Sequence, residues 1–152
     1  LLVLNRPAVL VLVNDRGRPL YATLKQVEKD QATLEINGVY NHVSVKDLES
    51  RWFGDLTLIW QKPPEYHNPI KPGSIGNSVE WMAEKLDTIY GTSLSSTSGM
   101  SYDRNLVNKL KDFQLQSGLI ADGIAGAQTM IHLNSATELN IPRLSAKDIE
   151  NI

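Results

Sequence analysis

Residues 118–129 read GLIADGIAGAQT, and this stretch decides how the second half of the chain folds. It contains three glycines, a single acid and no other charged residue, and it separates two segments with helical patterns. Three structures use glycines in this way: a calcium-binding loop, a phosphate-binding loop, and a tight turn that sets two helices against each other.

The residue types argue against the two ligand-binding loops. An EF-hand calcium loop needs acidic or amide side chains at several alternating positions and a glutamate at its end, whereas Asp122 is the one acid here. A phosphate-binding loop has a lysine after its glycines and a strand before them, and this stretch has no such lysine and follows a helical pattern. We therefore expect a tight turn between two helices.

Five residues would build this turn, each for its own physical reason. Gly118 follows the first helix where a left-handed residue can close it. Asp122 can accept a hydrogen bond from the backbone two residues on, and Gly123 can take the positive φ that this turn needs. Gly126 would let the next helix start close to its neighbour, and Thr129 begins that helix.

The patterns around the turn predict three helices. From Asn77 onward, apolar residues recur at three- and four-residue steps and mark one buried stripe. Asp103 can cap a second helix, because its carboxylate can accept backbone N–H groups of the first turn. The inward residues of these two helices would be Val79, Met82, Leu86, Ile89, Leu106, Leu110 and Phe113.

Residues 1–60 have the patterns of β-strands instead. Residues 8–13 (AVLVLV) form a continuous apolar run, which fits a strand buried on both faces. Residues 20–27 and 32–36 alternate between apolar and polar side chains, and the Asn37-Gly38 pair predicts a hairpin. Residues 55–60 (DLTLIW) predict the last strand of this part.

Together these patterns predict an α+β protein with two units. Residues 1–62 would form a small, mostly antiparallel β subdomain, and residues 76–140 a three-helix bundle. Residues 63–75 would be a stiff linker, because the stretch 61–76 contains four prolines. Residues 141–152 would be a tail.

Composition narrows the possible functions. A net charge of −2 over 152 residues gives no basic footprint for nucleic acid, and the longest apolar run, residues 8–13, is too short to span a bilayer. The absence of cysteine excludes a disulfide framework and a thiol nucleophile. His42, His67 and His132 have no second ligand at metal spacing, so we expect neither metal nor cofactor. Because the chain opens on Leu1, we expect a piece of a longer or processed protein.

The turn also carries a resemblance to a known family. Phe113-Gln114, Gly118-Leu119, Asp122-Gly123-Ile124, Gly126 and Thr129 match the pattern FQ…GL…DGI.G..T, and the chain from about residue 73 to 134 resembles the peptidoglycan-binding domain of bacterial wall hydrolases. The resemblance implies a compact three-helix bundle that docks on peptidoglycan without cleaving it. The family often repeats the glycine turn before its second helix; here residues 99–106 (GMSYDRNL) keep the aromatic Tyr102 and have Asp103 in place of a glycine.

The resemblance implies candidate peptidoglycan contacts, which are Tyr102, Asp103, Arg104, Asp122 and Gln128. The first three lie where the second helix begins, beside the groove that the family implies, and a helix N-terminus can hold a carboxylate of a peptide stem. Capping alone explains Asp103 equally well, and Asp122 is first a turn former. We expect Trp81 to pack on the linker or the β subdomain rather than to stack on a ligand.

The β subdomain resembles the sheet half of a papain-like peptidase of the bacteriocin-processing type, on residues 6–10, 20–24, 32–36 and 48–60. Such an enzyme needs a cysteine, a histidine and an orienting acid. Leu20 occupies the place of the histidine, and residues 35–37 offer only a weak substitute for the acid. We therefore expect no catalytic residue. An enzyme of another class that uses Asp103 and Asp122, and a protein-interaction module, remain as alternatives.

The two units in this order, joined by a proline-rich stretch, resemble the periplasmic end of an inner-membrane ATPase of type II secretion in Gram-negative bacteria. The resemblance implies a non-catalytic periplasmic module, without membrane insertion of its own, that helps to transport or assemble the outer-membrane secretin across the cell wall. The partners it implies are peptidoglycan, the secretin and an inner-membrane secretion protein B.

Overall fold

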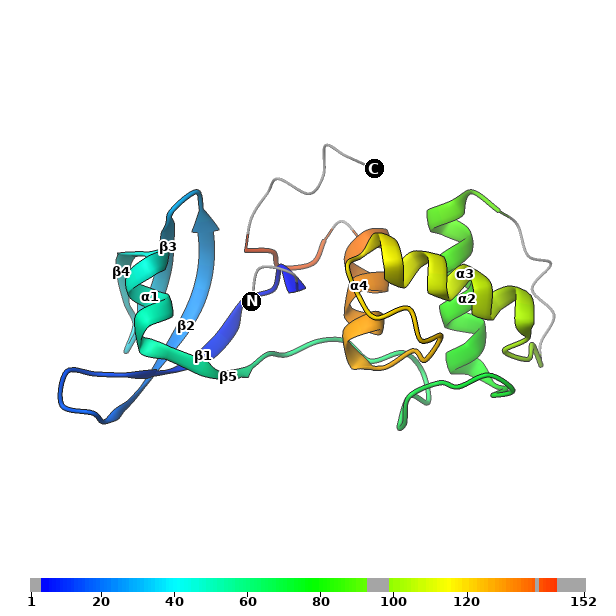
Figure 1. Cartoon of the computed structure of the whole chain (residues 1–152), viewed down its shortest axis with the longest axis horizontal. Coiled ribbons are helices and arrows are strands. Elements are labelled where there is room, and N and C mark those ends of the chain that lie inside the picture. The colour runs from blue at the N-terminus through cyan, green and yellow to red at the C-terminus, as the bar shows by residue number, and fades with distance from the viewer. Residues whose placement is uncertain (1–3, 93–98, 139, 145–152) are drawn as a thin grey trace. The chain divides into compact units, whose positions relative to one another are not determined.

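The computed structural model describes residues 4–92, 99–138 and 140–144 (Figure 1). Two compact units make up the chain, one of Leu1–Ile59 with Pro142–Ile152 and one of Trp60–Ile141. The first unit contains an antiparallel sheet and the second is helical, so the predicted α+β class is confirmed. Among the described residues, no helix combines the length and apolarity needed to cross a membrane.

The sheet unit has five antiparallel strands and one helix. The strands lie in the order β4-β3-β2-β1-β5. Their bounds are β1 (Ala8–Val13), β2 (Pro19–Glu28), β3 (Gln31–Ile36), β4 (Val39–Ser44) and β5 (Trp52–Thr57), and α1 (Val45–Arg51) connects the last two.

Local signals set the β3–β4 hairpin and the start of α1. Asn37 and Gly38 have φ angles of 51° and 79°, which a two-residue hairpin turn requires at both central positions. The predicted hairpin is therefore confirmed, with Ile36 opposite Val39. At the end of β4, Ser44 caps α1, since its Oγ accepts a hydrogen bond of 3.0 Å from the Asp47 amide.

One face of the sheet is covered and the other is open to solvent. Leu48 of α1 and Leu144, from near the end of the chain, pack with Ala8, Leu10 and Leu12 of β1 in one core cluster. The alternate residues of β1 point the other way, and Val9 is 38% exposed. The expectation that β1 is buried on both faces was therefore wrong, because the covering elements lie on one face.

The last strand begins earlier than its apolar run suggests. β5 covers Trp52–Thr57, whereas the sequence predicted a strand over residues 55–60. The chain becomes extended directly after α1, since Trp52 has φ −106° and ψ 121°. Trp52 then lies opposite Leu12 of β1, and its indole Nε1 donates to the Asp55 carbonyl over 2.8 Å. The pairing with β1 thus favours the earlier start.

The helical unit consists of α2 (Asn77–Tyr90), α3 (Arg104–Gln116) and α4 (Ala127–Thr137) around one core. The helical patterns are confirmed, because the inward residues named from the sequence are buried, apart from Ile89, which packs against the core and is half-buried. Asp103 caps α3, with its Oδ1 accepting a hydrogen bond of 2.9 Å from the Leu106 amide.

The proline-rich stretch packs on the helices. Tyr66 and Ile70 are buried in the helical core. Ile70 and Ala125 exchange two backbone hydrogen bonds of 2.9 and 3.1 Å, and the Asn134 side chain donates to the Gln61 carbonyl over 3.0 Å. Where a linker was expected, the structure thus has a segment that belongs to the helical unit. Trp81 also packs against this core, at 5.4 Å from the Lys85 ammonium.

Candidate functional site

The turn between α3 and α4 is held by its own backbone geometry. Gly118 and Gly123 have φ angles of 69° and 76°, in the left-handed region that favours glycine. The Asp122 Oδ1 accepts a hydrogen bond of 2.8 Å from the Ile124 amide, two residues further on. These residues therefore form the tight turn that their chemistry allows.

A buried amide on α3 fixes the turn to the helix. Gln114 is 1% exposed, and its Oε1 accepts a hydrogen bond of 2.9 Å from the Gly123 amide. Its Nε2 donates to the Asp122 Oδ1 at 3.1 Å, to the Ile124 carbonyl at 3.0 Å and to the Thr129 Oγ1 at 3.3 Å. Sequence reasoning gave Gln114 no role. The available signal was its place on the inward stripe of α3, four residues after Leu110.

Tyr102 supports the same turn from inside the core. It is 1% exposed, and its hydroxyl donates a hydrogen bond of 2.8 Å to the Gly123 carbonyl. Burial, and to a lesser degree the Asp122 carboxylate, raise the pKa of Tyr102 well above its ordinary value. Its side chain is therefore placed to hold the turn, not to face a ligand at the surface.

Neighbouring side chains leave no room for a side chain at Gly123, but they do leave room at Gly126. A Cβ at Gly123 would lie 2.9 Å from Lys111 Cε and 3.2 Å from Val107 Cγ1, so the turn packs closely on α3 at this point. A Cβ at Gly126 would meet no atom within 4 Å, and the φ there is −81°. The expectation that Gly126 allows a close approach of the third helix was therefore wrong.

The remaining candidate residues lie at the surface near the start of α3 and of α4. A hollow of about 130 Å³ is lined by Met100, Ser101, Asp103, Asn105, Leu106 and Lys109. Arg104 is exposed at the first position of α3, and Gln128 is exposed in the first turn of α4. The structure thus joins Tyr102 and Asp122 through the turn, and places Asp103 in the wall of the hollow.

Lys109, which also lines this hollow, is already paired. Its Nζ lies 2.8 Å from the Asp87 Oδ1 of α2, and it also donates to the Thr92 hydroxyl. The cation nearest the start of α3 that carries no such pairing in the described structure is Arg104. The first amides of α3 lie at the same end, where a helix leaves N–H groups without an intrahelical acceptor. The Asp103 carboxylate already accepts from one of these amides, that of Leu106, so Arg104 is the group at this end that can attract a further carboxylate.

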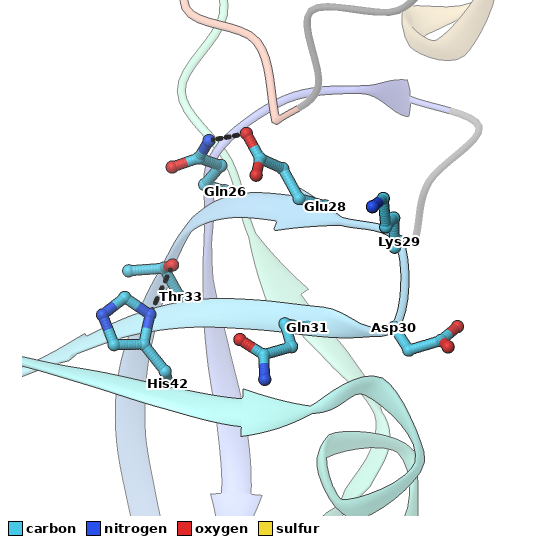
Figure 2. A pocket seen from close by; sticks show the side chains of 7 residues that line it. All are labelled: Gln26, Glu28, Lys29, Asp30, Gln31, Thr33 and His42. Atoms are coloured by element: carbon cyan, nitrogen blue, oxygen red, sulfur yellow. Dashed lines mark hydrogen bonds between the residues drawn. The ribbon is translucent and has the colours of Figure 1, made fainter.

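A wider hollow of about 570 Å³ lies in the sheet unit, near the β2–β3 hairpin (Figure 2). Its lining is polar, and two hydrogen bonds join its side chains: Thr33 Oγ1 to His42 Nδ1 at 3.1 Å, and Gln26 Nε2 to Glu28 Oε1 at 2.6 Å. It contains none of the residues implicated from the sequence. In the described parts of both units, no cluster of three or more histidine or acidic side chains could hold a metal ion.

Comparison with known proteins identifies the helical unit. Residues 75–133 match the family described as "Putative peptidoglycan binding domain". The helical unit is thus similar to this family. The match runs from just before α2 into α4, and it includes the turn that Gln114, Tyr102 and Gly123 hold together. The resemblance drawn from the turn residues is therefore confirmed, and this segment is called the peptidoglycan-binding domain below.

One relative extends the similarity to both units, and a second is similar over more than half of the chain. General secretion pathway protein A of Aeromonas hydrophila is 32% identical over 143 residues, which are 93% of this chain and 25% of the relative. "Putative general secretion pathway protein A" of Escherichia coli (strain K12) is 32% identical over 88 residues, which are 58% of this chain and 18% of the relative. The chain thus spans a quarter or less of these relatives. The predicted resemblance to the secretion protein is confirmed.

A solved structure has the same fold. The crystal structure of a periplasmic domain of the EpsAB fusion protein of the Vibrio vulnificus type II secretion system has a TM-score of 0.57. Its sequence is 24% identical, and the alignment covers 91% of this chain and 60% of the other. The likeness therefore supports the fold.

Proposed function

We propose that the helical unit binds peptidoglycan and does not cleave it. The observation that carries this proposal is the family match over residues 75–133, a unit in which Gln114 bonds to Asp122 and Gly123 of the turn. No cysteine is present, and Leu20 stands where the resemblance to a cysteine peptidase would place a histidine. The chain therefore acts as a binding module.

The start of α3 is the proposed contact surface. Arg104 supplies an exposed cation, and the hollow beside Asp103 offers space for an alkyl side chain. Peptide stems of peptidoglycan carry carboxylates that match these donors. Asp122 and Gln128 are further proposed contacts, and Tyr102 acts by holding the turn.

The proposed role of the whole chain rests on similarity to its relatives. We propose that it is part of a periplasmic region of a type II secretion protein, which anchors to the cell wall and helps the outer-membrane secretin to cross or assemble in it. Similarity to general secretion pathway protein A supports this role. The proposed partners are peptidoglycan, the secretin and an inner-membrane secretion protein B.

Co-sedimentation with purified, protein-free sacculi tests the binding proposal. We expect the intact chain to pellet with the sacculi. Arg104→Glu should weaken binding about tenfold, since a charge-assisted hydrogen bond contributes about 1.5–3 kcal/mol. Arg16→Glu makes the same charge change at an exposed position of the sheet unit and should leave pelleting unchanged. An intact chain that stays in the supernatant would exclude peptidoglycan as the ligand.

The same incubation separates binding from hydrolysis. We expect no release of muropeptides; release that disappears in Asp122→Asn would show that the chain is an enzyme. A protein-interaction module is the second candidate, because Leu115 and Ile120 of the helical unit are 71% and 84% exposed. This alternative predicts no pelleting with protein-free sacculi, and capture of the secretin or protein B that is lost in Leu115→Ser with Ile120→Ser.

A further inference from the structure

The open face of the sheet carries a cluster of polar side chains at its β2–β3 hairpin. Residues paired across neighbouring strands place their side chains on the same face. Val27 and Ala32 of this hairpin are buried in the sheet core, so the residues on either side of them point to the open face. The strand pairings bring together five polar residues there: Gln26 with Thr33, Thr33 with His42, and Glu28 with Gln31 (Figure 2).

These five residues line the hollow of about 570 Å³, together with Lys29 and Asp30 of the turn. Small-molecule sites have volumes of roughly 300–1,000 Å³, so the hollow has the size of a ligand site. Its lining contains no apolar residue, and the carboxylates of Glu28 and Asp30 against the Lys29 ammonium give a formal charge of −1 with His42 neutral. A ligand here is therefore recognised through hydrogen bonds.

The carboxamides of the hollow offer donors and acceptors at the same time. The Gln26 Nε2 donates to Glu28 over 2.6 Å, which leaves the Gln26 Oε1 as an acceptor. Among the described residues, the Gln31 carboxamide has no hydrogen-bond partner, so both its N–H groups and its oxygen are available. A carboxamide pairs with an acetamido group, which also has one N–H donor and one carbonyl acceptor.

An aromatic ring lies beside this polar cluster. Tyr40 is 60% exposed and precedes His42 by two residues in β4, so the two side chains point to the same face of the sheet. An exposed ring of this kind combines an apolar face with a polar hydroxyl. It can therefore pack against the C–H face of a sugar ring while neighbouring polar groups bind the sugar's hydrogen-bonding groups.

Other classes of ligand fit the hollow less well. The negative formal charge disfavours phosphates and nucleic acid. In residues 4–92, 99–138 and 140–144, no group of three or more histidine or acidic side chains could hold a metal ion. Extended peptides are recognised at strand edges and through side-chain pockets, whereas this hollow lies on a sheet face and has no apolar lining.

We propose that this hollow binds a neutral oligosaccharide of N-acetylated amino sugars, with acetamido groups on Gln26 and Gln31 and a sugar ring on Tyr40. The choice of the cell wall as the source rests on the proposed function, because the glycan strands of peptidoglycan consist of such sugars. The sheet unit would then contact the glycan strand, separately from the contact of Arg104 with peptide stems.

Titration of the whole chain with a trimer of N-acetylglucosamine, followed by amide NMR spectra, tests the site. We expect saturable shifts at residues 26–33 and 40–42, with a dissociation constant on the order of 1 mM, because exposed neutral hydrogen bonds each contribute little. Maltotriose has the same number of sugar rings without acetamido groups and should bind at least about fivefold more weakly. Gln31→Ala and Tyr40→Ser should each weaken binding of the trimer about fivefold.

Two matched variants control for unspecific effects. Tyr21→Ser removes another exposed tyrosine of the sheet unit, and Gln116→Ala removes an exposed carboxamide of α3. Both should leave trimer binding unchanged, and melting curves should show that all four variants are folded. The proposal would be overturned by an absence of shifts at the hollow, by equal binding of maltotriose, or by a control variant that weakens binding as much as Gln31→Ala.

The trimer also separates this site from the proposed peptide-stem surface, because it carries no peptide. Arg104→Glu should weaken pelleting with sacculi and leave trimer binding unchanged. Loss of trimer binding in Arg104→Glu would place the sugar site on the helical unit and overturn the proposal. A chain that binds the trimer at the hollow but does not pellet with sacculi would contradict the proposed function and leave the saccharide site standing.

Discussion

At the residue scale, two buried polar groups hold the turn of the peptidoglycan-binding domain. Gln114 binds both sides of the turn, and Tyr102 donates to the Gly123 carbonyl. A buried polar group without a partner is costly, so each of these groups specifies one position of the turn. The proposed contact surface begins at Arg104, two residues after Tyr102. Its position therefore depends on the hydrogen bond that Tyr102 makes to the turn.

Tyr102→Phe tests this support and its pH dependence. At neutral pH the variant should lose about 1 kcal/mol of unfolding free energy with the bond to Gly123. The pKa of Tyr102 is raised in the folded protein, chiefly by burial, whereas the unfolded chain has the ordinary pKa near 10. The contribution of the neutral phenol is therefore full below pH 10 and is lost as pH rises above it.

The difference in unfolding free energy between wild type and Tyr102→Phe should consequently stay constant up to about pH 9 and narrow as pH rises past about 10 towards 11, as measured by urea unfolding at each pH. Burial also raises the pKa values of Tyr66 and Tyr90, but both proteins share these residues, so their effects cancel in the comparison. A gap that is constant over this range would contradict the role given to Tyr102.

At the element scale, the turn between α3 and α4 needs a backbone conformation at Gly123 that glycine adopts without strain. Gly123→Val should destabilise the helical unit by at least about 1–2 kcal/mol, because φ is 76° and a β-branched side chain would meet Val107 and Lys111. Asp122→Ala should cost about 1 kcal/mol through the lost bond to the Ile124 amide. Melting temperature and sacculus binding should fall together in both variants.

Two results would change this assignment of the turn. If Asp122→Ala abolishes sacculus binding while its melting curve matches wild type, Asp122 contacts the ligand directly. Gly126→Ala is the matched control: with φ −81° and no neighbour within 4 Å, it should leave stability unchanged within about 0.5 kcal/mol. A marked loss in that variant would show that glycine is needed there for another reason.

The elements that the sequence predicted correctly are those with local causes. The β3–β4 hairpin follows from Asn37-Gly38, and the stripe of α2 follows from a helical period, so neighbouring residues suffice to infer them. The errors concern contacts between distant residues. The start of β5 depends on its pairing with β1, and the burial of Tyr66 and Ile70 depends on helices far along the chain. The role of Gln114 was missed because its partners follow eight to fifteen residues later.

At the scale of the whole molecule, the sheet unit is built from two separate segments of the chain. Leu144 is fully buried in the sheet core, although more than 80 residues of the helical unit precede it. Its carbonyl accepts a hydrogen bond of 2.9 Å from the Val27 amide, and its own amide donates to the Asn5 Oδ1 at 3.0 Å. The helical unit is therefore inserted between two parts of one fold.

Leu144→Ala tests whether this residue completes the core of the sheet unit. Truncation of a fully buried leucine costs about 2–5 kcal/mol, so the sheet unit should unfold at a lower urea concentration. Leu115→Ala, at an exposed leucine of α3, is the matched control and should change stability little. Hydrogen exchange of the β1 and β2 amides reports on the sheet unit alone. Unchanged protection of these amides in Leu144→Ala would show that Leu144 does not stabilise the core of the sheet unit.

The bonds between Asn5 and Leu144 also determine how the protein would carry mechanical load. Tension applied at these two positions would pass directly through hydrogen bonds at one place in the sheet unit. The intervening chain, with all three helices of the peptidoglycan-binding domain, lies outside that path until the Asn5–Leu144 contact breaks. Pulling on the sheet unit at these two positions would thus put no tension on the helices of the peptidoglycan-binding domain for as long as these bonds hold.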